Sequence, residues 1–418
     1  MLSMKIKDLK NKRILILGFG LEGKNTLNFL RKEFPKKELS VADEKDIRDP
    51  KIKNINWIIG KEYLKFLNDF DVIIRTPGIA LKKIKTKAII TSQTELFLEN
   101  YQGLVIGITG TKGKSTTSAL IHHILKKNKL NSYLVGNIEN PALPYLNKKN
   151  AIIVYEMSCH QLDGLNISPK IAVFLNIYKE HLDYYSSFKS YFNAKANIAL
   201  HQKKGDKFIF NPKFKWIDNL KTKSKKIPIS NYDKLFKENP WLLDITHKDN
   251  LIAVFRVGEL FLGINQILKA LKSFKKLPHR LEHFGDYQGI DFYDDSISTI
   301  PESTIYALDK LGENVETLIV GGLDRGIDFK KLSQRINKSK IKTLILFPES
   351  GEKIRKGIKR KINYYPVSSI KDAVNICFEK TNQNKICLLS PASPSYNMFK
   401  NFKERGDLFK KYVREYEE

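Results

Sequence analysis

Short apolar runs that end at glycine or polar residues recur along the chain, and helical spacing follows many of them. Arg13-Ile-Leu-Ile-Leu and Leu104-Val-Ile-Gly-Ile are two such runs, and each has the length and composition of a buried strand. The second run leads into Lys114 to Leu125, where apolar residues recur at helical spacing. Strands that alternate with helices predict an α/β fold with parallel-rich sheets.

The segment Gly107-Ile-Thr-Gly-Thr-Lys-Gly-Lys-Ser-Thr116 joins this second strand to its helix. Glycines let backbone N–H groups converge on phosphate oxygens, and the helix dipole favours the negative charge. Lys114 would reach the β- and γ-phosphates, and the Ser115 hydroxyl would hold Mg²⁺. Ile108 stands where the general P-loop pattern GxxxxGK(S/T) has its first glycine, so this is a narrower variant of that pattern.

A second glycine-rich turn, Gly18-Phe-Gly20-Leu-Glu-Gly23, follows the first strand and precedes a helix predicted from Asn25 to Lys32. Asp43 ends the next strand, so the turn alone suggests a dinucleotide site with Asp43 on a ribose. The same turn would also receive the diphosphate of a UDP-sugar. Thr76-Pro-Gly-Ile79 is predicted to be only a turn.

Further downstream, the strand Ala151-Ile-Ile-Val-Tyr ends in Glu156, a carboxylate placed to bind the Mg²⁺ of a nucleotide. By composition alone, His181 is an ordinary loop histidine and Lys195 a surface lysine. After residue 277, four more strand patterns alternate with helices and indicate a second doubly wound sheet. Polar motifs follow these strands, where open α/β sheets place their ligands.

The composition of the 418 residues narrows the class of protein. The net charge of +28 comes from lysines spread along the whole chain, without a basic block interleaved with aromatic residues, so no nucleic-acid partner is expected. No apolar run is long enough to cross a membrane, and the N-terminus lacks a signal-peptide core. Three cysteines fit a reducing cytoplasm, where we expect the protein to reside.

Several collinear motifs resemble those of the Mur ligases, and the resemblance covers essentially the whole chain. They are Thr109-Gly-Thr-Lys-Gly-Lys-Ser-Thr, Glu156-Met-Ser-Cys-His-Gln161-Leu, Asn176-Ile-Tyr-Lys-Glu-His181-Leu-Asp, Ala194-Lys195, Leu277-Pro-His-Arg280-Leu-Glu, Asp294-Asp295-Ser, and Leu389-Ser-Pro-Ala-Ser. The block from Phe399 to Gly406 resembles the MurD-type branch, whose members join glutamate to UDP-N-acetylmuramoyl-L-alanine in cell-wall peptidoglycan synthesis.

The resemblance implies three domains: a Rossmann-like UDP-binding domain at 1–102, a central P-loop ATPase domain at 103–276 and a Rossmann-like amino-acid-binding domain at 277–418. It implies an ADP-forming ligase that uses ATP and Mg²⁺ and makes an acyl phosphate, which the amino group of glutamate then attacks. The expected partners are these small-molecule substrates, and by analogy we expect a monomer with hinges near residues 103 and 277.

The resemblance also implies roles for individual residues. The catalytic residues would be Lys114, Glu156, His181 and Lys195. The metal ligands would be Ser115, Glu156, His181 and a carbamylated Lys195. The ATP site would comprise Gly110, Thr111, Lys112, Gly113, Lys114, Ser115, Thr116, Asn265, Arg280 and Asp295. The UDP-linked substrate would contact Gly20, Leu21, Glu22, Asp43, Glu44, Asn137, Ser158 and Gln161. Glutamate would contact Thr299, Arg325, Ser395 and Phe402.

Two segments depart from the family pattern. Ile297 stands where many MurD-type proteins have a lysine, and an isoleucine cannot pair with a carboxylate. D-Glutamate is the expected substrate, and the alternative is L-glutamate followed by a separate epimerase. Val257 to Gly263 also lacks the usual His-Asn pair, which affects the adenine contacts. The competing hypotheses are a different Mur ligase, a folylpolyglutamate-synthase-like enzyme, and an inert nucleotide or nucleic-acid binder.

Overall fold

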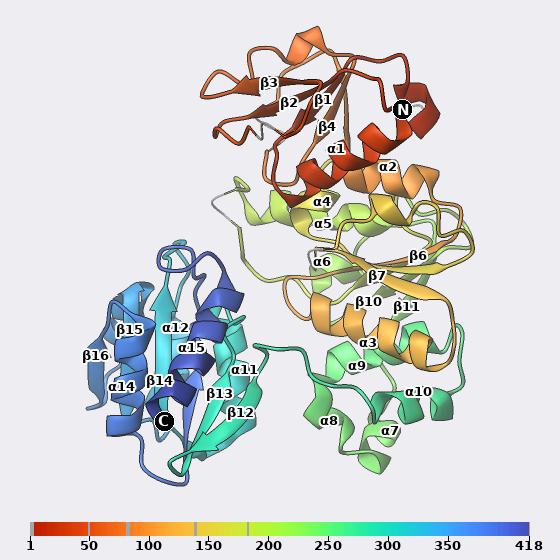
Figure 1. The fold of residues 1–418 in the computed structure, drawn as a ribbon. Helices are drawn as coiled ribbons and strands as arrows, with labels where there is room; N and C mark the ends of the chain where they lie inside the picture. The colour runs from red at the N-terminus through yellow and green to blue at the C-terminus, as the bar shows by residue number, and fades with distance from the viewer. Residues whose placement is uncertain (1–3, 49–50, 81–83, 138–139, 182–183, 418) are drawn as a thin grey trace. The chain divides into compact units, whose positions relative to one another are not determined.

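The computed structural model describes residues 4–48, 51–80, 84–137, 140–181 and 184–417 (Figure 1), so the motif residues Leu182 and Asp183 lie outside the described part. The chain forms two compact units, Met1–Phe274 and Lys275–Glu418. The first unit holds two sheets and the second holds one. The predicted α/β class is confirmed, because every sheet is parallel or nearly so and is flanked by helices.

The first sheet is fully parallel, with strand order β3-β2-β1-β4-β5. Its strands and helices are β1 (Ile14–Leu17), α1 (Leu21–Glu33), β2 (Leu39–Asp43), β3 (Ile55–Ile59), β4 (Val72–Arg75), β5 (Ile89–Ser92) and α2 (Gln93–Asn100). Side chains of β1 alternate between two apolar clusters, as the period of two in a strand requires. Helix α1 starts at Leu21, inside the glycine-rich turn and earlier than the predicted Asn25.

The central sheet is also parallel, with order β11-β10-β9-β6-β8-β7. Its strands are β6 (Leu104–Thr109), β7 (Ser132–Gly136), β8 (Ile152–Glu156), β9 (Ile171–Phe174), β10 (Lys207–Phe210) and β11 (Lys225–Pro228). The helices are α3 (Lys114–Lys127), α4 (Cys159–Leu162), α5 (Phe188–Leu200), α6 (Lys215–Asp218), α7 (Asp233–Glu238), α8 (Leu242–Ile245), α9 (Lys248–Gly258) and α10 (Ile264–Leu271).

One apolar cluster runs from the first sheet into the central one. Leu27 and Leu30 of α1 belong to the same cluster as Phe97 of α2 and Tyr155 of β8. A second cluster, on the other face of the central sheet, joins the strands to α3, α9 and α10. This shared core explains why residues 1–274 form a single unit, since buried apolar area is the main force that holds layers together.

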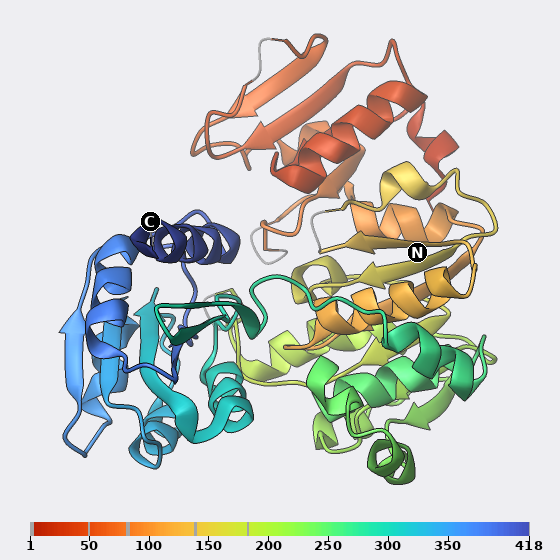
Figure 2. The ribbon, with the colours of Figure 1, turned by 60° about the horizontal axis from the view of Figure 1, so that its bottom comes forward.

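The second unit has a mixed sheet of order β12-β13-β17-β14-β15-β16, in which only the β12–β13 pair is antiparallel. Its strands are β12 (Glu282–Tyr287), β13 (Ile290–Asp294), β14 (Val315–Gly322), β15 (Thr343–Glu349), β16 (Asn363–Pro366) and β17 (Lys385–Leu389). Its helices are α11 (Pro301–Leu311), α12 (Lys330–Asn337), α13 (Ser350–Lys356), α14 (Ile370–Lys380) and α15 (Phe402–Glu417). Helices α14 and α15 lie side by side on one face (Figures 1 and 2), and α11, α12 and α13 cover the other.

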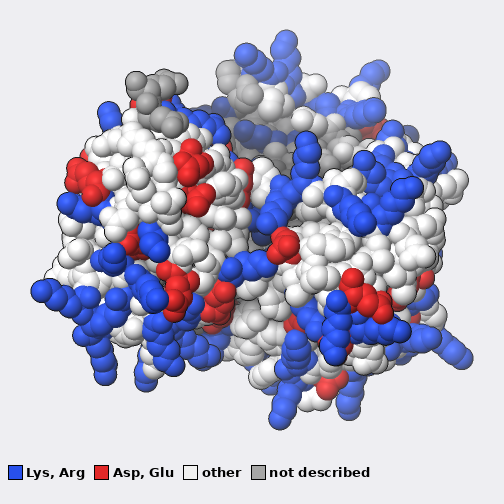
Figure 3. Space-filling view, turned by 90° about the horizontal axis from the view of Figure 1, so that it is seen from below, with Lys and Arg blue, Asp and Glu red and all other residues white. Residues whose placement is uncertain are grey.

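Lysine and arginine side chains are scattered over the face of the molecule shown in Figure 3, with acidic and uncharged residues between them. Within the described residues, no helix has both the length and the apolar composition that a bilayer crossing needs.

Candidate functional site

The loop between β6 and α3 has the geometry that its glycines predict. Gly113 precedes the helix with φ of 83°, a left-handed conformation that glycine adopts without strain. A Cβ on Gly113 would lie 2.5 Å from Oδ1 of Asn250 at the start of α9, so a larger residue would displace the Asn250 side chain. A glycine-rich loop that leads into a helix N-terminus in this way is suited to bind phosphate through the backbone N–H groups of the first helical turn.

Asn176, which follows β9, holds this loop in place through two hydrogen bonds. Its Oδ1 accepts the N–H of Lys112 at 2.9 Å, and its Nδ2 donates to the carbonyl of Lys112 at 3.0 Å. The Thr111 hydroxyl accepts the N–H of Tyr178 at 2.9 Å and lies 3.0 Å from the Tyr191 hydroxyl. The sequence contained Asn176 within a motif but did not indicate this anchoring role.

Positive charge gathers at the loop. Nζ of Lys114 donates to the carbonyls of Gly110 and Thr111, both at 3.0 Å. Nζ of Lys112 lies 3.2 Å from Oε1 of Glu180. Burial alone would raise the pKa of Glu180, but Lys112, His181 and Lys114 together lower it to about 2. Ser115 and Thr116 occupy the first turn of α3 and are half-buried.

Glu156, at the end of β8, is the candidate metal ligand with the clearest support. The residue is 1% exposed. Its Oε1 accepts Nδ2 of Asn137 at 3.0 Å, whereas its Oε2 is buried and has no hydrogen-bond partner among the described residues. An unpaired buried carboxylate oxygen is costly, and Mg²⁺ prefers oxygen ligands of this kind. Glu156 thus fits a divalent cation beside a phosphate loop.

Lys195 in α5 is fully buried, unlike the surface lysine that composition alone suggests. Its Nζ donates to the carbonyl of Gly110 at 2.9 Å and lies 5.2 Å from the centre of the Tyr191 ring. Burial, helped by the nearby Lys114, lowers the pKa of Lys195 to about 8 against the raising effects of Cys159, Glu180 and Glu156. The structure therefore brings Lys195, the phosphate loop and Glu156 together.

His181 lies at the edge of the same region. It has a positive φ of 57°, and its Nε2 lies 3.8 Å from Oε2 of Glu180. Its ring packs edge-on against His160 with centroids 4.9 Å apart, and His160 in turn contacts Tyr184. The contact with His160 and the proximity to Glu180, which pairs with Lys112, together keep His181 close to the loop.

The predicted UDP-contacting residues of the first sheet meet in one pocket of about 650 Å³. Gly20, Leu21, Glu22, Asp43 and Glu44 all line it. Both oxygens of Asp43 are held by backbone N–H groups, Oδ2 by Phe19 at 2.8 Å and Oδ1 by Lys45 at 3.0 Å. The turn from Thr76 to Ala80 and the distant Tyr184 also line the pocket, and sequence reasoning missed both.

Ser158 and Gln161 form a capping box at the start of α4, so their side chains already make hydrogen bonds within the protein. Ser158 Oγ accepts the N–H of Gln161 at 3.2 Å, and the N–H of Ser158 donates to Gln161 Oε1 at 2.9 Å. Nε2 of Gln161 then donates to Oε1 of Glu22 at 2.6 Å. This chain of bonds links the pocket of the first sheet to the segment that follows Glu156.

Asn265 is exposed in the first turn of α10 and lines a second pocket, of about 860 Å³, with Arg256 and Glu259. None of the residues lining that pocket belongs to the phosphate loop. The structure thus does not bring Asn265 to the other predicted ATP residues of the first unit.

In the second unit, Thr299, Arg325 and Ser395 follow the adjacent strands β13, β14 and β17. The Arg325 guanidinium lies 5.7 Å from the centre of the Tyr396 ring. Phe402 lies near His279, and its carbonyl accepts the Ser296 hydroxyl at 2.7 Å. Three of the four predicted glutamate contacts thus share the carboxyl edge of one sheet, as expected for a ligand site in this class.

Arg280 is half-buried, and Asp295 is bound within its own unit. Asp295 Oδ1 accepts the N–H of Leu281 at 3.1 Å, and Oδ2 accepts the hydroxyls of Ser298 at 2.5 Å and Ser390 at 2.7 Å. Burial raises the pKa of Asp295 to about 7. These bonds give Asp295 a structural role at the end of β13.

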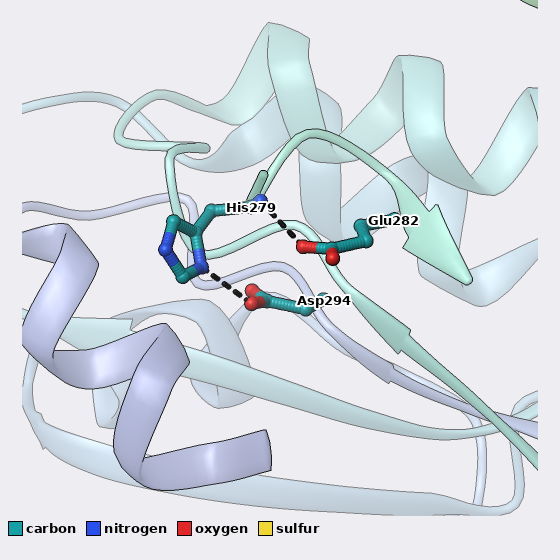
Figure 4. Close-up of side chains that lie close together, drawn as sticks. All are labelled: His279, Glu282 and Asp294. Atoms are coloured by element: carbon teal, nitrogen blue, oxygen red, sulfur yellow. Dashed lines mark hydrogen bonds and ion pairs between the residues drawn. The ribbon is translucent and has the colours of Figure 1, made fainter. Parts of the chain in front are cut away.

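His279, Glu282 and Asp294 converge closely enough to resemble a metal site (Figure 4). Nδ1 of His279 lies 2.6 Å from Oδ2 of Asp294, and the N–H of His279 donates to Oε2 of Glu282 at 2.8 Å. Nζ of Lys410 lies 3.0 Å from Glu282 and 3.6 Å from Asp294. Because an ammonium already neutralises these carboxylates, we interpret the cluster as an internal ion network.

Comparisons with known proteins agree with the motifs. A family model described as the Mur ligase middle domain matches residues 108–261, and one described as the Mur ligase glutamate ligase domain matches residues 279–393.

The chain is 31% identical to a UDP-N-acetylmuramoylalanine–D-glutamate ligase of Clostridium kluyveri, covering 97% of each chain. A ligase of the same name from Borreliella afzelii is 30% identical over 98% of this chain and 99% of that one. A crystal structure of the MurF ligase of Thermotoga maritima in complex with ADP superposes with a TM-score of 0.60 at 16% identity, covering 99% and 97% of the two chains.

Proposed function

Because this chain belongs to the Mur ligase family, we propose that it is an ATP-dependent ligase that joins D-glutamate to UDP-N-acetylmuramoyl-L-alanine. The carrying observation is that two buried residues lie at the phosphate loop: Lys195, and Glu156, whose Oε2 has no hydrogen-bond partner among the residues that the structure describes. The products would be the extended UDP-linked peptide, ADP and phosphate, in the cytoplasmic synthesis of peptidoglycan precursors. We propose that the enzyme acts as a monomer.

Activation of the carboxylate is the first chemical task. The alanine carboxylate is a poor acyl donor, so it first attacks the γ-phosphorus of ATP and forms an acyl phosphate as ADP leaves. In this proposal the N–H groups of residues 110–116 and Nζ of Lys114 hold the β- and γ-phosphates and offset their charge. Ser115 and Glu156 would hold Mg²⁺, which would supply further neutralisation of the phosphate oxygens.

Lys195 is proposed to act as a carbamate. A buried ammonium would repel a cation, whereas addition of CO₂ to the neutral amine forms an N–C bond, releases a proton and creates an anionic oxygen ligand. The lowered pKa of Lys195 supports this step, since only the neutral amine is a nucleophile. His181 would complete the second metal site beside it.

The second chemical step is attack of the glutamate amine on the acyl phosphate, with phosphate leaving from a tetrahedral intermediate. In this proposal Arg325 binds a carboxylate of glutamate through paired N–H donors, and Thr299, Ser395 and Phe402 complete the acceptor site. The first-sheet pocket and Asn137 would hold the UDP-linked substrate. Arg280 and Asp295 remain proposed contacts of ATP, whereas Asn265 lies in the separate pocket beside Arg256.

The names of the relatives support D-glutamate, whereas Ile297 in the acceptor segment favours L-glutamate as a second candidate. Phosphate release by the purified protein with Mg²⁺, ATP and UDP-N-acetylmuramoyl-L-alanine tests both, in parallel reactions with the two enantiomers. Turnover with D-glutamate alone is the expected result. Turnover with L-glutamate alone would assign the second candidate, and turnover with neither would contradict the proposed ligase.

A further inference from the structure

Tyr396, in the loop that follows β17, is an aromatic side chain that burial does not hold in place. It is 62% exposed, although its neighbours Ser393 to Ser395 are buried. A single exposed aromatic residue needs no explanation by itself. This one, however, lies at the carboxyl edge of the sheet, next to Ser395, which we propose to contact glutamate. What the ring contacts therefore decides its role.

The ring of Tyr396 contacts the side chain that we propose to bind a carboxylate of glutamate. The guanidinium carbon of Arg325 lies over the ring, 5.7 Å from its centre. This distance is within the range in which an aromatic face attracts a cation. Arg325 belongs to the loop after β14, so the contact joins two of the loops at this edge of the sheet.

The backbones of the two loops fix the position of this contact. The N–H of Leu323 donates to the carbonyl of Pro394 at 2.9 Å. A Cβ on Gly322 would lie only 2.3 Å from that same carbonyl oxygen, so glycine is what lets the two loops run this close together. Arg325 and Tyr396 stand equally far along the chain beyond this bond. The fold itself thus brings the two side chains together.

The surroundings of Arg325 make its orientation important for binding an acceptor. Ile297, in the loop after β13, cannot pair with a carboxylate. The acidic neighbour Asp324 is engaged by other groups, because it pairs with Lys353 and its Oδ1 accepts the N–H of Gly326 at 3.0 Å. Among the side chains that we propose to contact glutamate, Arg325 alone carries a positive charge. Recognition of a carboxylate therefore depends on it.

An unconstrained arginine side chain is poorly prepared for this task. It has many rotamers, and ordering them on binding lowers the affinity for the ligand. Paired N–H donors also reach both oxygens of a carboxylate only when the planar guanidinium is turned the right way. An aromatic face that holds the guanidinium before glutamate arrives reduces the ordering cost and fixes the orientation of the plane.

We propose that Tyr396 is a positioning residue of the acceptor site, whose ring orients the Arg325 guanidinium for a bidentate pair with a carboxylate of glutamate. This inference rests on the proposed function, because it requires glutamate to bind at Arg325. Tyr396 acts through Arg325 and makes no contact of its own with the reacting atoms. It therefore contributes to the affinity for the acceptor and leaves the chemical steps unchanged.

Tyr396→Leu tests the proposal, because it removes the aromatic face and keeps an apolar side chain. We expect the KM for glutamate to rise about three- to fivefold, the effect of an exposed cation–π pair, with kcat within about twofold of the parent. Tyr396→Phe keeps the ring and should keep the KM of the parent. Both variants should melt at the temperature of the parent, since the side chain is mostly exposed. Steady-state phosphate release by the full-length enzyme measures both constants, with Mg²⁺, ATP and UDP-N-acetylmuramoyl-L-alanine in excess and glutamate varied.

A double-mutant cycle shows whether Tyr396 acts through Arg325. Arg325→Lys keeps the positive charge but replaces the planar fork with an ammonium that has no plane to orient. In that background, Tyr396→Leu should change the KM for glutamate by less than about twofold. An equal effect in both backgrounds would mean that Tyr396 acts on its own, and would overturn the positioning role.

Tyr364→Leu is the matched control. Tyr364, in the edge strand β16, is 48% exposed, and the Arg355 guanidinium lies 4.6 Å from the centre of its ring. The variant removes the same kind of contact from the same unit, at a strand that carries none of the proposed glutamate contacts. It should have the KM and kcat of the parent.

Four further results would overturn the inference: a parent-like KM in Tyr396→Leu, an equal rise of KM in Tyr364→Leu, a loss confined to kcat, or a Tyr396→Phe variant that loses as much as Tyr396→Leu. Each of them leaves the proposed ligase intact, since the parent still turns over. A parent that releases no phosphate in response to either enantiomer of glutamate contradicts the proposed function instead.

Discussion

Glu349, at the end of β15, accepts the backbone N–H of Asp324 at 2.8 Å and so anchors the loop that carries Arg325. Its other oxygen accepts Nδ2 of Asn397 at 3.1 Å, from the loop that carries Ser395. Glu349 holds φ of 65° and ψ of −88°, an uncommon backbone conformation for a residue with a side chain. One strained residue thus braces both loops that we propose to contact glutamate.

We expect Glu349→Ala to raise the KM for glutamate about tenfold with a smaller change in kcat, because two bracing hydrogen bonds are lost. Steady-state phosphate release at varied glutamate concentration measures both constants. Glu352→Ala is the control, since Glu352 lies in the helix that follows Glu349 and pairs with Arg355. A lower kcat at unchanged KM would contradict the bracing role, and Glu349→Gln should recover part of the loss.

Lys114→Ala should abolish turnover, because the phosphate loop loses its mobile cation while its backbone is retained. We expect kcat to fall by about a thousandfold or more. The melting temperature should stay close to that of the parent, because Lys114 is half-buried and its Nζ bonds to carbonyls of its own loop. Phosphate release and a thermal melt measure the two quantities. Activity near that of the parent would remove the assignment of this loop to ATP.

Lys195→Ala should be inactive and should regain part of its activity when a short carboxylate such as acetate is added. The substitution removes a fully buried side chain, which leaves space beside Gly110 for a small anion that replaces the carbamate. Lys189→Ala, at an exposed position of the same helix, should behave like the parent with or without acetate. Full activity of Lys195→Ala without acetate would argue against a carbamate.

Arg75→Lys should destabilise the first unit and weaken binding of the UDP-linked substrate. Arg75 is 3% exposed, and its guanidinium bonds to carbonyls of the pocket turn and of the segment after α4, which a single ammonium cannot reach in the same way. We expect a loss of about 2 kcal/mol or more in urea denaturation. Arg48→Lys, an exposed pair with Asp46, should lose almost nothing, and an equal loss in both variants would refute the claim.

Glu22→Gln should change how stability depends on pH. Burial raises the pKa of this carboxyl in the folded protein to about 7, well above the ordinary range of a glutamate. Between the ordinary pKa and the raised one, the folded state keeps a proton that the unfolded state loses, so the stability of the parent falls as pH rises through this range. We expect the free energy of unfolding of Glu22→Gln to exceed that of the parent by about 3 kcal/mol at about pH 8, and to be similar to it at about pH 4. The same difference at both values would contradict this.

The phosphate loop and the strands around it are predictable because their determinants are neighbours in the chain. Strand β6, the glycine turn and α3 lie within 104–127, and their spacing already specifies the backbone geometry. The helix predicted from Asn25 begins too late, since Leu21 and Glu22 lie between two glycines that usually signal a turn and here form the first helical turn.

The pocket of the first sheet depends on contacts that spacing does not reveal. The pattern of Thr76 to Ile79 predicts a plain turn, yet this segment lines the pocket, and Tyr184 reaches the same pocket from the segment between β9 and α5. Asn265 shows the opposite case, because its motif position suggests an ATP contact while the structure places it in a separate pocket. Neighbours distant in sequence decide each of these outcomes.

The sequence by itself determined the class of fold, the order of the strands along the chain, the phosphate loop and the family, because each depends on local periodicity or on motifs in a fixed order. Only the tertiary structure decided how deeply individual charged groups are buried. Lys195 and Glu22 are ordinary charged residues in the sequence, and packing against segments far away in the chain buries both and shifts their pKa values toward neutrality. Desolvation depends on everything that surrounds a side chain, and no short stretch of sequence contains that information.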